Sequence, residues 1–205
     1  HIVDNLGTYY AAFNCKSPLF ADKTPEQAAC MREAFSLLID RDYIVENVGQ
    51  SGQVPANSFI PLGMADGNGG VFKPDVDEGY FDVYGINNNY EGTLEKARTL
   101  LKAAGYKFDD DGMLSAETPI SVEYLTNNGT GHIAVAEAIQ QDLAALGINM
   151  TIQSQNWNVF LEERKNGNFD FCREGWLADF NDPINMLEMW ITDSGNNDCQ
   201  YGRVG

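Results

Sequence analysis

The second half of the chain contains three strand-like segments: ISVEYL at Ile120–Leu125, INMTIQ at Ile148–Gln153 and FDFCREGW at Phe169–Trp176. Two segments with apolar side chains at helical spacing, Thr130–Leu146 and Asn156–Lys165, separate them. Connections of this length join parallel strands rather than hairpins. The pattern therefore predicts a β-α-β-α-β core with a mainly parallel sheet.

The start of the chain adds one strand and one well-marked helix. Leu6–Asn14 (LGTYYAAFN) is rich in residues that favour strands. Thr24 followed by Pro25, with Gln27 at the capping-box position, predicts a helix from Pro25 to about Asp40. A shorter helix, Tyr43–Val48, should follow and end at Gly49.

The middle of the chain is rich in Gly, Pro and Asn over residues 50–92, so we expect no helix there before Thr93. Thr93–Ala104 should be an amphipathic helix with Thr93 as its N-cap and Gly105 as its C-cap. Asp182-Pro183 should begin a last helix, Ile184–Trp190. The whole is an α/β domain with long irregular loops.

Composition excludes several classes of function. The 205 residues carry 13 Lys and Arg against 30 Asp and Glu, a formal charge of −17. Nucleic acids and anionic membrane surfaces attract basic proteins, so neither is expected as a partner. Only two histidines, His1 and His132, are present, and no spacing suits a metal site. Asp109-Asp110-Asp111-Gly112 lacks the ligand spacing of a calcium loop and indicates a solvated turn.

The four cysteines are Cys15, Cys30, Cys172 and Cys199. They are either buried thiols or disulfides, and disulfides would indicate an oxidising compartment. Pairing of neighbours predicts Cys15–Cys30 and Cys172–Cys199. Four cysteines allow three pairings, however, and the sequence does not choose between them.

A candidate ligand site follows the third core strand, in the segment FDFCREGWLADFNDP. Ligands of open α/β sheets bind at the carboxyl ends of the strands. Trp176 offers an apolar wall, Asp179 an anion for an ammonium group, and Arg173 a cation for a carboxylate. A buried Trp with charges at the rim is the alternative interpretation. The predicted ligand-binding residues are Arg173, Gly175, Trp176, Asp179 and Asn181.

Catalytic motifs are weak by comparison. The chain has neither a nucleotide-binding fingerprint nor a GxSxG nucleophile elbow, and His132 lacks an obvious catalytic partner. Asp179 with Asp182 or Glu174 could form a hydrolytic carboxylate pair. Chance pairs are frequent among 30 acidic residues, so a hydrolase is kept only as an alternative from another class.

Four motifs in order resemble a known family: MREAFSLLIDRDYIV at Met31–Val45, PANSFIP at Pro55–Pro61, ARTLLKAAGY at Ala97–Tyr106, and GWLADFNDP at Gly175–Pro183. They resemble the oligopeptide/dipeptide-binding proteins of ABC importers, the family 5 extracytoplasmic solute-binding proteins. The resemblance runs from Thr8 to Tyr201. It implies a lobe of a periplasmic-binding-protein-like fold, of type II and cluster C.

The resemblance also implies a domain organisation and a cellular setting. Residues 1–205 would form a single α/β lobe, the second large lobe of a two-lobed receptor, truncated at both ends. The expected partners are short peptides, the missing first lobe and the permease subunits of an ABC importer. The full-length protein would lie outside the cytoplasmic membrane, on the cell surface or in the periplasm, held by a lipid anchor.

Roles for single residues follow from the same resemblance. The acid of the GWxADxxxP motif, here Asp179, would pair with the α-amino group of a peptide, Trp176 would line the pocket and Arg173 would engage carboxylates. Some relatives have a disulfide where Gly7 and Leu177 stand, and that bond cannot form here. The implied protein is a receptor without cofactors rather than an enzyme. Nickel, haem or an oligosaccharide remain alternative ligands within the family.

Overall fold

The computed structural model describes residues 5–73 and 90–203. Its helices and strands are β1 (Gly7–Phe13), α1 (Pro25–Leu38), α2 (Arg41–Tyr43), α3 (Tyr90–Ala103), β2 (Ser121–Asn127), α4 (Thr130–Ala144), β3 (Asn149–Gln155), α5 (Trp157–Asn166), β4 (Phe171–Leu177) and α6 (Ile184–Leu187). Two 3-10 helices, Pro18–Phe20 and Glu188–Trp190, and a π-helical segment, Ile44–Gly49, complete the regular structure of these residues.

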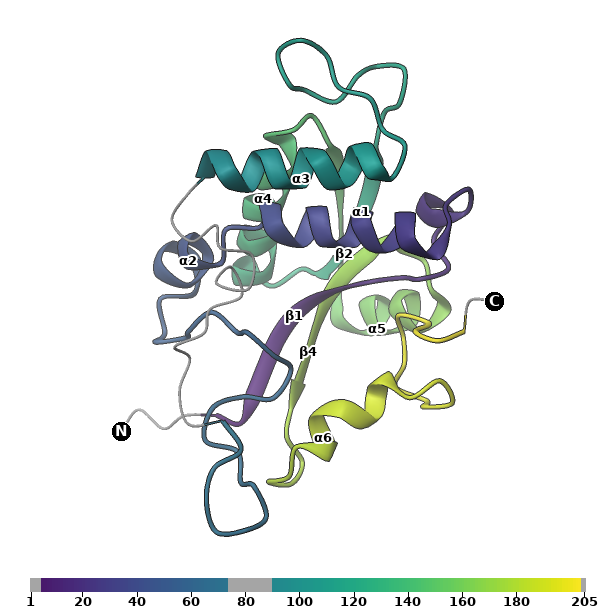
Figure 1. Cartoon of the computed structure of the whole chain (residues 1–205). Coiled ribbons are helices and arrows are strands. Elements are labelled where there is room, and N and C mark those ends of the chain that lie inside the picture. The colour runs from purple at the N-terminus through teal and green to yellow at the C-terminus, as the bar shows by residue number, and fades with distance from the viewer. Residues whose placement is uncertain (1–4, 74–89, 204–205) are drawn as a thin grey trace.

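The described strands form one sheet in the order β1-β4-β2-β3. β2 is parallel to both β3 and β4, and β1 is antiparallel to β4 (Figure 1). The predicted β-α-β-α-β core is therefore confirmed, with the N-terminal strand added at one edge. Tyr9 lies opposite Gly175 in the β1–β4 register, a pairing that shapes the candidate site.

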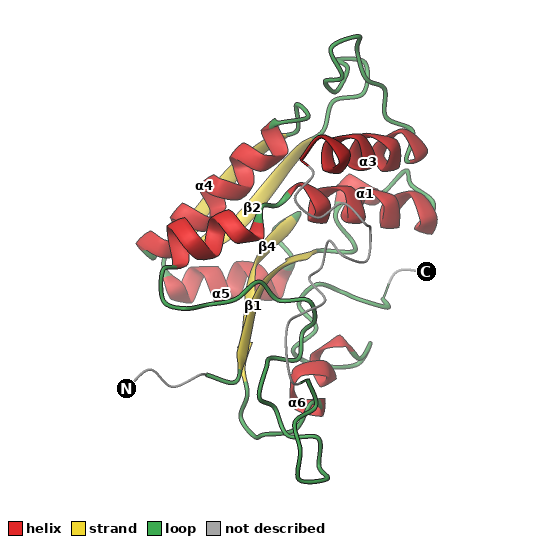
Figure 2. Cartoon of the chain, turned by 60° about the vertical axis from the view of Figure 1, so that its left-hand side comes forward, coloured by secondary structure: helices red, strands yellow, loops and turns green. Residues whose placement is uncertain are grey.

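Helices cover both faces of the sheet. Phe35 of α1, Leu101 of α3 and Ile139 of α4 share the main core with Phe171 of β4. The next residue of β4 points to the other face, where it meets α5 in a smaller cluster of Leu125, Phe160, Phe169 and Cys172. The two clusters thus place α1, α3 and α4 on one face of the sheet and α5 on the other, and Figure 2 shows α1 and α3 lying side by side. None of the helices in the described ranges is both long and apolar enough to cross a membrane.

The start of α1 agrees with the sequence, and the start of α3 does not. Thr24 and Gln27 form the predicted capping box, and the Asp40 carboxylate accepts a hydrogen bond from the backbone N–H of Tyr43. Helix α3, however, begins at Tyr90, so the prediction of Thr93 as N-cap is wrong. Glu91 in the first turn suits the positive end of the helix dipole, which favours the earlier start.

The irregular segment before α3 is described only up to residue 73, so residues 74–89 of that prediction lie outside the described part. Within it, the Thr8 hydroxyl donates to the carbonyl of Phe59 at 2.9 Å, and a single bridge pairs Ala65 with Val71. The segment thus lies along β1, next to the end of β4. The predicted acidic turn is also present, since Asp109 accepts hydrogen bonds from the backbone N–H groups of Asp111 and Met113.

No two of the four cysteines are bonded in this structure, which therefore contains neither the predicted Cys15–Cys30 nor the predicted Cys172–Cys199 disulfide. Cys30 packs against the main core from α1, whereas Cys172 is fully buried on the α5 side of the sheet. Cys15, just after β1, donates a backbone hydrogen bond to the carbonyl of Cys199 at 2.9 Å.

Candidate functional site

The carboxyl ends of the three parallel strands lie along one edge of the sheet. β2 ends at Asn127, β3 at Gln155 and β4 at Leu177, and β4 extends beyond its neighbour because Leu125 pairs with Cys172. Helices α4, α5 and α6 start just after these ends. This edge therefore has the position at which open α/β sheets bind ligands.

Arg173 lies at this edge within an aromatic cage. Its guanidinium carbon is 5.2 Å from the ring centre of Tyr9, 5.5 Å from that of Trp157 and 5.9 Å from that of Phe160. Its Nε–H is buried and has no hydrogen-bond partner among the described residues. None of the ion pairs in that part of the chain includes Arg173. Arg173 thus has no ion-pair partner among the described residues, and burial lowers its pKa.

Two further polar side chains border the cage. The ring of His132, near the start of α4, is 6.4 Å from that of Tyr9 in an edge-on arrangement. Burial, assisted by the positive charge of Arg173, lowers the pKa of His132, which favours a neutral imidazole at pH 7. The side-chain oxygen of Asn127 is buried and lacks a hydrogen-bond partner among the described residues. A neutral histidine and an arginine together suit a bound carboxylate.

Gly175 makes room for this cage. A Cβ atom on Gly175 would lie 2.4 Å from Cδ1 and 2.8 Å from Cε1 of Tyr9. The ring of Tyr9 therefore rests directly on the backbone of Gly175, next to Arg173. The absence of a side chain at this position is a requirement for the Tyr9–Arg173 contact.

Trp176 and Asp179 are organised by one buried amide. The side-chain oxygen of Asn185, which is 1% exposed, accepts hydrogen bonds from Trp176 Nε1–H at 3.1 Å and from the backbone N–H of Asp179 at 2.8 Å. The Trp176 ring packs against a small cluster of Ile60, Met64 and Met186. The half-buried tryptophan thus anchors the loop and the neighbouring segment, and only part of its ring faces solvent.

The carboxylate of Asp179 is exposed and belongs to none of the ion pairs within the described ranges. The neighbouring Asp182 instead accepts a hydrogen bond from the backbone N–H of Ile184 at 2.9 Å and so caps α6. Asn181 accepts a hydrogen bond from the backbone N–H of Ala65 at 2.8 Å. Asp182 and Asn181 shape the loop, and Asp179 keeps a carboxylate available for a ligand.

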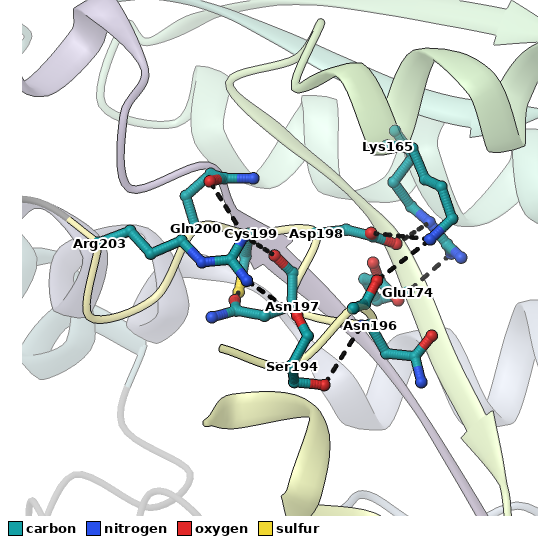
Figure 3. Close-up of polar contacts among 11 residues, drawn as sticks. Lys165, Glu174, Ser194, Asn196, Asn197, Asp198, Cys199, Gln200 and Arg203 are labelled. Carbon is teal, nitrogen blue, oxygen red and sulfur yellow. Dashed lines mark hydrogen bonds and ion pairs between the residues drawn. The ribbon is translucent and has the colours of Figure 1, made fainter. Parts of the chain in front are cut away.

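Glu174, the other acid considered for catalysis, faces away from this site. It forms an ion pair with Arg164 of α5 at 3.2 Å, and Arg164 also contacts Asp198 at 3.0 Å. Lys165 of α5 donates a hydrogen bond to the carbonyl of Gly195, which lies in the segment that follows α6 (Figure 3). Burial, partly offset by Arg164, raises the pKa of Glu174 to about 7. The arrangement is a structural network under the sheet, not a pair with Asp179.

The structure therefore places Arg173, Gly175 and Trp176 in β4 and Asp179 and Asn181 in the loop that follows it. Sequence reasoning missed Tyr9, His132 and Asn185. His132 and Trp157 each lie in the first turn of the helix that follows a predicted strand, and this position could have marked them as candidate site residues. No sequence pattern marked Tyr9 or Asn185. The role of Tyr9 depends on the register of β1 against β4, and that of Asn185 on its position in α6.

Comparison with known proteins supports a common origin. The family described as "Bacterial extracellular solute-binding proteins, family 5 Middle" matches residues 1–198. The periplasmic oligopeptide-binding protein OppA of Salmonella typhimurium is 32% identical over 200 residues, which cover 96% of this chain and 32% of that protein. The dipeptide-binding protein DppE of Bacillus subtilis is 32% identical over 198 residues, with 96% and 32% covered.

Solved structures agree. The murein tripeptide binding protein MppA of Escherichia coli superimposes with a TM-score of 0.77 at 30% identity, over 96% of this chain and 34% of that one. Its fold is that of the type II periplasmic binding proteins. The chain thus spans about a third of the length of the relatives it matches.

Proposed function

Because this chain belongs to family 5 of the bacterial extracellular solute-binding proteins, we propose that it is one lobe of a receptor that captures short peptides for an ABC importer. The relatives named above bind oligopeptides, dipeptides and a murein tripeptide according to their names, which supports a peptide as the ligand. Residues 1–205 would form the second large lobe, and the rest of the ligand contacts would come from a first lobe.

One observation carries the proposal: the carboxyl edge of β4 presents two unpaired charges of opposite sign. Asp179 would bind the α-amino group of a peptide and Arg173 its carboxylate. In an acidic chain, an arginine that is left without a carboxylate at the ligand edge is best explained by an anionic group of the ligand. A bound zwitterion would give the half-buried Arg173 and the exposed Asp179 partners of opposite charge.

Strand geometry bounds the ligand length. Arg173 and Leu177 are separated by about 13 Å of extended strand, since each residue rises about 3.3 Å, and Asp179 follows in the loop. A peptide that spans this distance in an extended form has about four residues. We therefore expect short peptides with free termini to bind most tightly.

The mechanism would be capture by closure. Backbone hydrogen bonds to an extended peptide would supply affinity that is independent of side chains, and wet pockets would tolerate many sequences. The two lobes would close about a hinge, and the closed form would be recognised by the permease subunits. We place the receptor outside the cytoplasmic membrane, as its family implies, and a lipid anchor would hold it there.

The alternatives receive less support. A hydrolase needs two acids that flank the scissile bond, but Glu174 pairs with Arg164 on the other face and Asp182 caps α6. A nickel receptor would need chelating groups, and the described residues contain no cluster of three or more potential ligands. A sugar receptor would use exposed Trp157, whose ring already contacts the Arg173 guanidinium. We propose that the chain is not an enzyme and needs no cofactor.

The test uses a substitution in the full-length receptor that keeps the shape of the side chain but removes its charge. Asp179→Asn should weaken binding of a tripeptide with a free amino group by at least about 30-fold, since losing one partner of a desolvated charge pair costs roughly 2–5 kcal/mol. The N-acetylated tripeptide should bind the wild type and the variant alike. Asp182→Asn is the matched control and should leave calorimetric affinity close to wild type. Wild-type affinity of Asp179→Asn for the free tripeptide would overturn the proposal.

A further inference from the structure

The C-terminal segment, residues 191–203, packs against the end of β1 through contacts that the ligand site does not use. Asp198 meets Arg164 and Lys165 of α5, and Arg203 donates hydrogen bonds to carbonyls of its own segment (Figure 3). One contact brings two cysteines together: the backbone N–H of Cys15 donates to the carbonyl of Cys199 at 2.9 Å. Both cysteines also line the same small cavity, together with Arg32 and Trp190.

We propose that Cys15 and Cys199 form a disulfide bond in the mature protein, and that this bond fastens the C-terminal segment to β1. The backbone hydrogen bond holds the two main chains side by side, and a disulfide joins residues whose Cα atoms are roughly 4.4–6.8 Å apart. Because both residues border one cavity, their side chains have a common space in which the two sulfurs can meet. The pairing is one of the three that four cysteines allow, and it joins residues far apart in sequence.

The surroundings of the cysteines favour the Cys15–Cys199 pair over pairs that include Cys30 or Cys172. Cys172 is fully buried in the small cluster under α5, where an external oxidant has no access. Cys30 packs from α1 against the main core. Burial raises the pKa of Cys199 to about 11, and the nearby Cys15 sulfur adds to that rise.

The chemistry is thiol–disulfide exchange with a small-molecule or protein disulfide as the oxidant. The half-buried Cys15 thiol loses its proton and attacks the external disulfide, which releases one thiolate and leaves a mixed disulfide. The Cys199 thiolate then attacks the Cys15 sulfur and displaces the second thiolate, and the two released thiolates take up the two protons. Two cysteines lose two electrons in total, and the external disulfide gains them. An extracytoplasmic location supplies such oxidants.

The position of the bond gives it a structural consequence. The closed loop from Cys15 to Cys199 contains β2, β3, β4 and α6, so it includes the loop that carries Asp179. The bond would hold the segment that follows α6 against β1. Its reduction would free the segment while leaving the Arg164–Glu174 pair in place. We therefore expect the bond to stabilise the lobe and to leave the ligand charges unchanged.

Peptide mapping provides a direct test, because trypsin places each cysteine in a different peptide: residues 1–16, 24–32, 166–173 and 174–203. The protein is exported to an oxidising compartment, its free thiols are blocked with maleimide under denaturing conditions, and the digest is analysed by mass spectrometry without reduction. The proposal predicts a linked species of peptides 1–16 and 174–203 that disappears on reduction, with Cys30 and Cys172 alkylated. A link between 1–16 and 24–32 or between 166–173 and 174–203, or four alkylated cysteines after treatment with oxidised glutathione, overturns it.

A second measurement separates the bond from a packing role of the thiols. Cys15→Ser and Cys199→Ser should each lower the melting temperature of the oxidised protein by several degrees, and reductant should abolish the difference from wild type. Cys30→Ser is the matched control and should respond to reductant as the wild type does. If reductant leaves the melting temperature of the wild type unchanged, the proposed bond is absent.

Discussion

The side chain of Asn185 accepts a hydrogen bond from the backbone N–H of Asp179 at 2.8 Å, so a buried amide of α6 fixes the start of the ligand loop. The same oxygen accepts the indole N–H of Trp176 at 3.1 Å. Because Asn185 is 1% exposed, water cannot replace it when it is removed. The orientation of the candidate anion therefore depends on a residue that does not itself reach the ligand.

Asn185→Leu should lower both stability and affinity. The substitution keeps the volume but leaves two donors without an acceptor, at a cost of roughly 1–3 kcal/mol each when they remain buried. We expect a lower urea midpoint and a peptide affinity reduced by about tenfold in calorimetry. Asn149→Ala, at an exposed position of β3, is the control and should change neither. A destabilised variant with wild-type affinity would show that the amide only supports the fold.

Gly175→Ala should disturb the arginine cage. The new Cβ would meet the Tyr9 ring at 2.4 Å, so the ring must move away from Arg173. We expect a stability loss of about 1–3 kcal/mol, as for other cases of overpacking. We also expect a lower affinity for peptides with a free carboxylate. Gly131→Ala provides the control, because its Cβ would meet no atom within 4 Å. Equal stability of the two variants in denaturant titrations would contradict the close contact.

Much of the fold could be predicted from local sequence signals. The alternation of Ile120–Leu125 and the cap formed by Thr24 and Gln27 place a strand and a helix correctly, because both depend on neighbours in the chain. The start of α3 could not be placed, since the helix extends back through Gly92 to Tyr90. The neighbour pairing of cysteines is not seen either, since no two of the four sulfurs are bonded in this structure.

The site was predictable in its composition but less so in its geometry. Arg173 and Asp179 stand at the carboxyl edge of the sheet, as the order of strands and helices indicated. The role of Tyr9 depends on its register opposite Gly175 across an antiparallel pair, and no pattern in the N-terminal strand marks that partner. Long-range register of this kind is set by the whole sheet rather than by local sequence.

Arg173→Met should separate binding from stability. The side chain keeps much of its apolar contact with Tyr9 and Trp157 but loses the charge, so a half-buried cation whose Nε–H lacks a partner among the described residues disappears from the empty protein. We expect no loss of stability, a pattern typical of binding residues. Affinity for a peptide with a free carboxylate should fall by about tenfold or more, while affinity for its C-terminal amide should not change. A loss of stability with equal affinity for both peptides would assign Arg173 to the fold alone.

Glu174→Gln should remove a pH-dependent part of the stability. Burial and the nearby Asp198 raise the pKa of Glu174 from 4.5 to about 7, despite the opposing effect of Arg164 at 3.2 Å and of Arg173. The protonated form is therefore the one that the folded state favours. Its contribution is complete below about pH 4.5 and is lost as the pH rises through 7, and it amounts to on the order of 3 kcal/mol.

The measurement is the difference in unfolding free energy between the wild type and Glu174→Gln from pH 4.5 to 8. Since glutamine does not titrate, the wild type should lose stability relative to the variant over this range. Glu162→Gln, at an exposed position of the same helix that carries Arg164, is the control and should parallel the wild type. Parallel curves for wild type and Glu174→Gln would mean that Glu174 stays ionised in the fold, with Arg164 fully compensating for its burial.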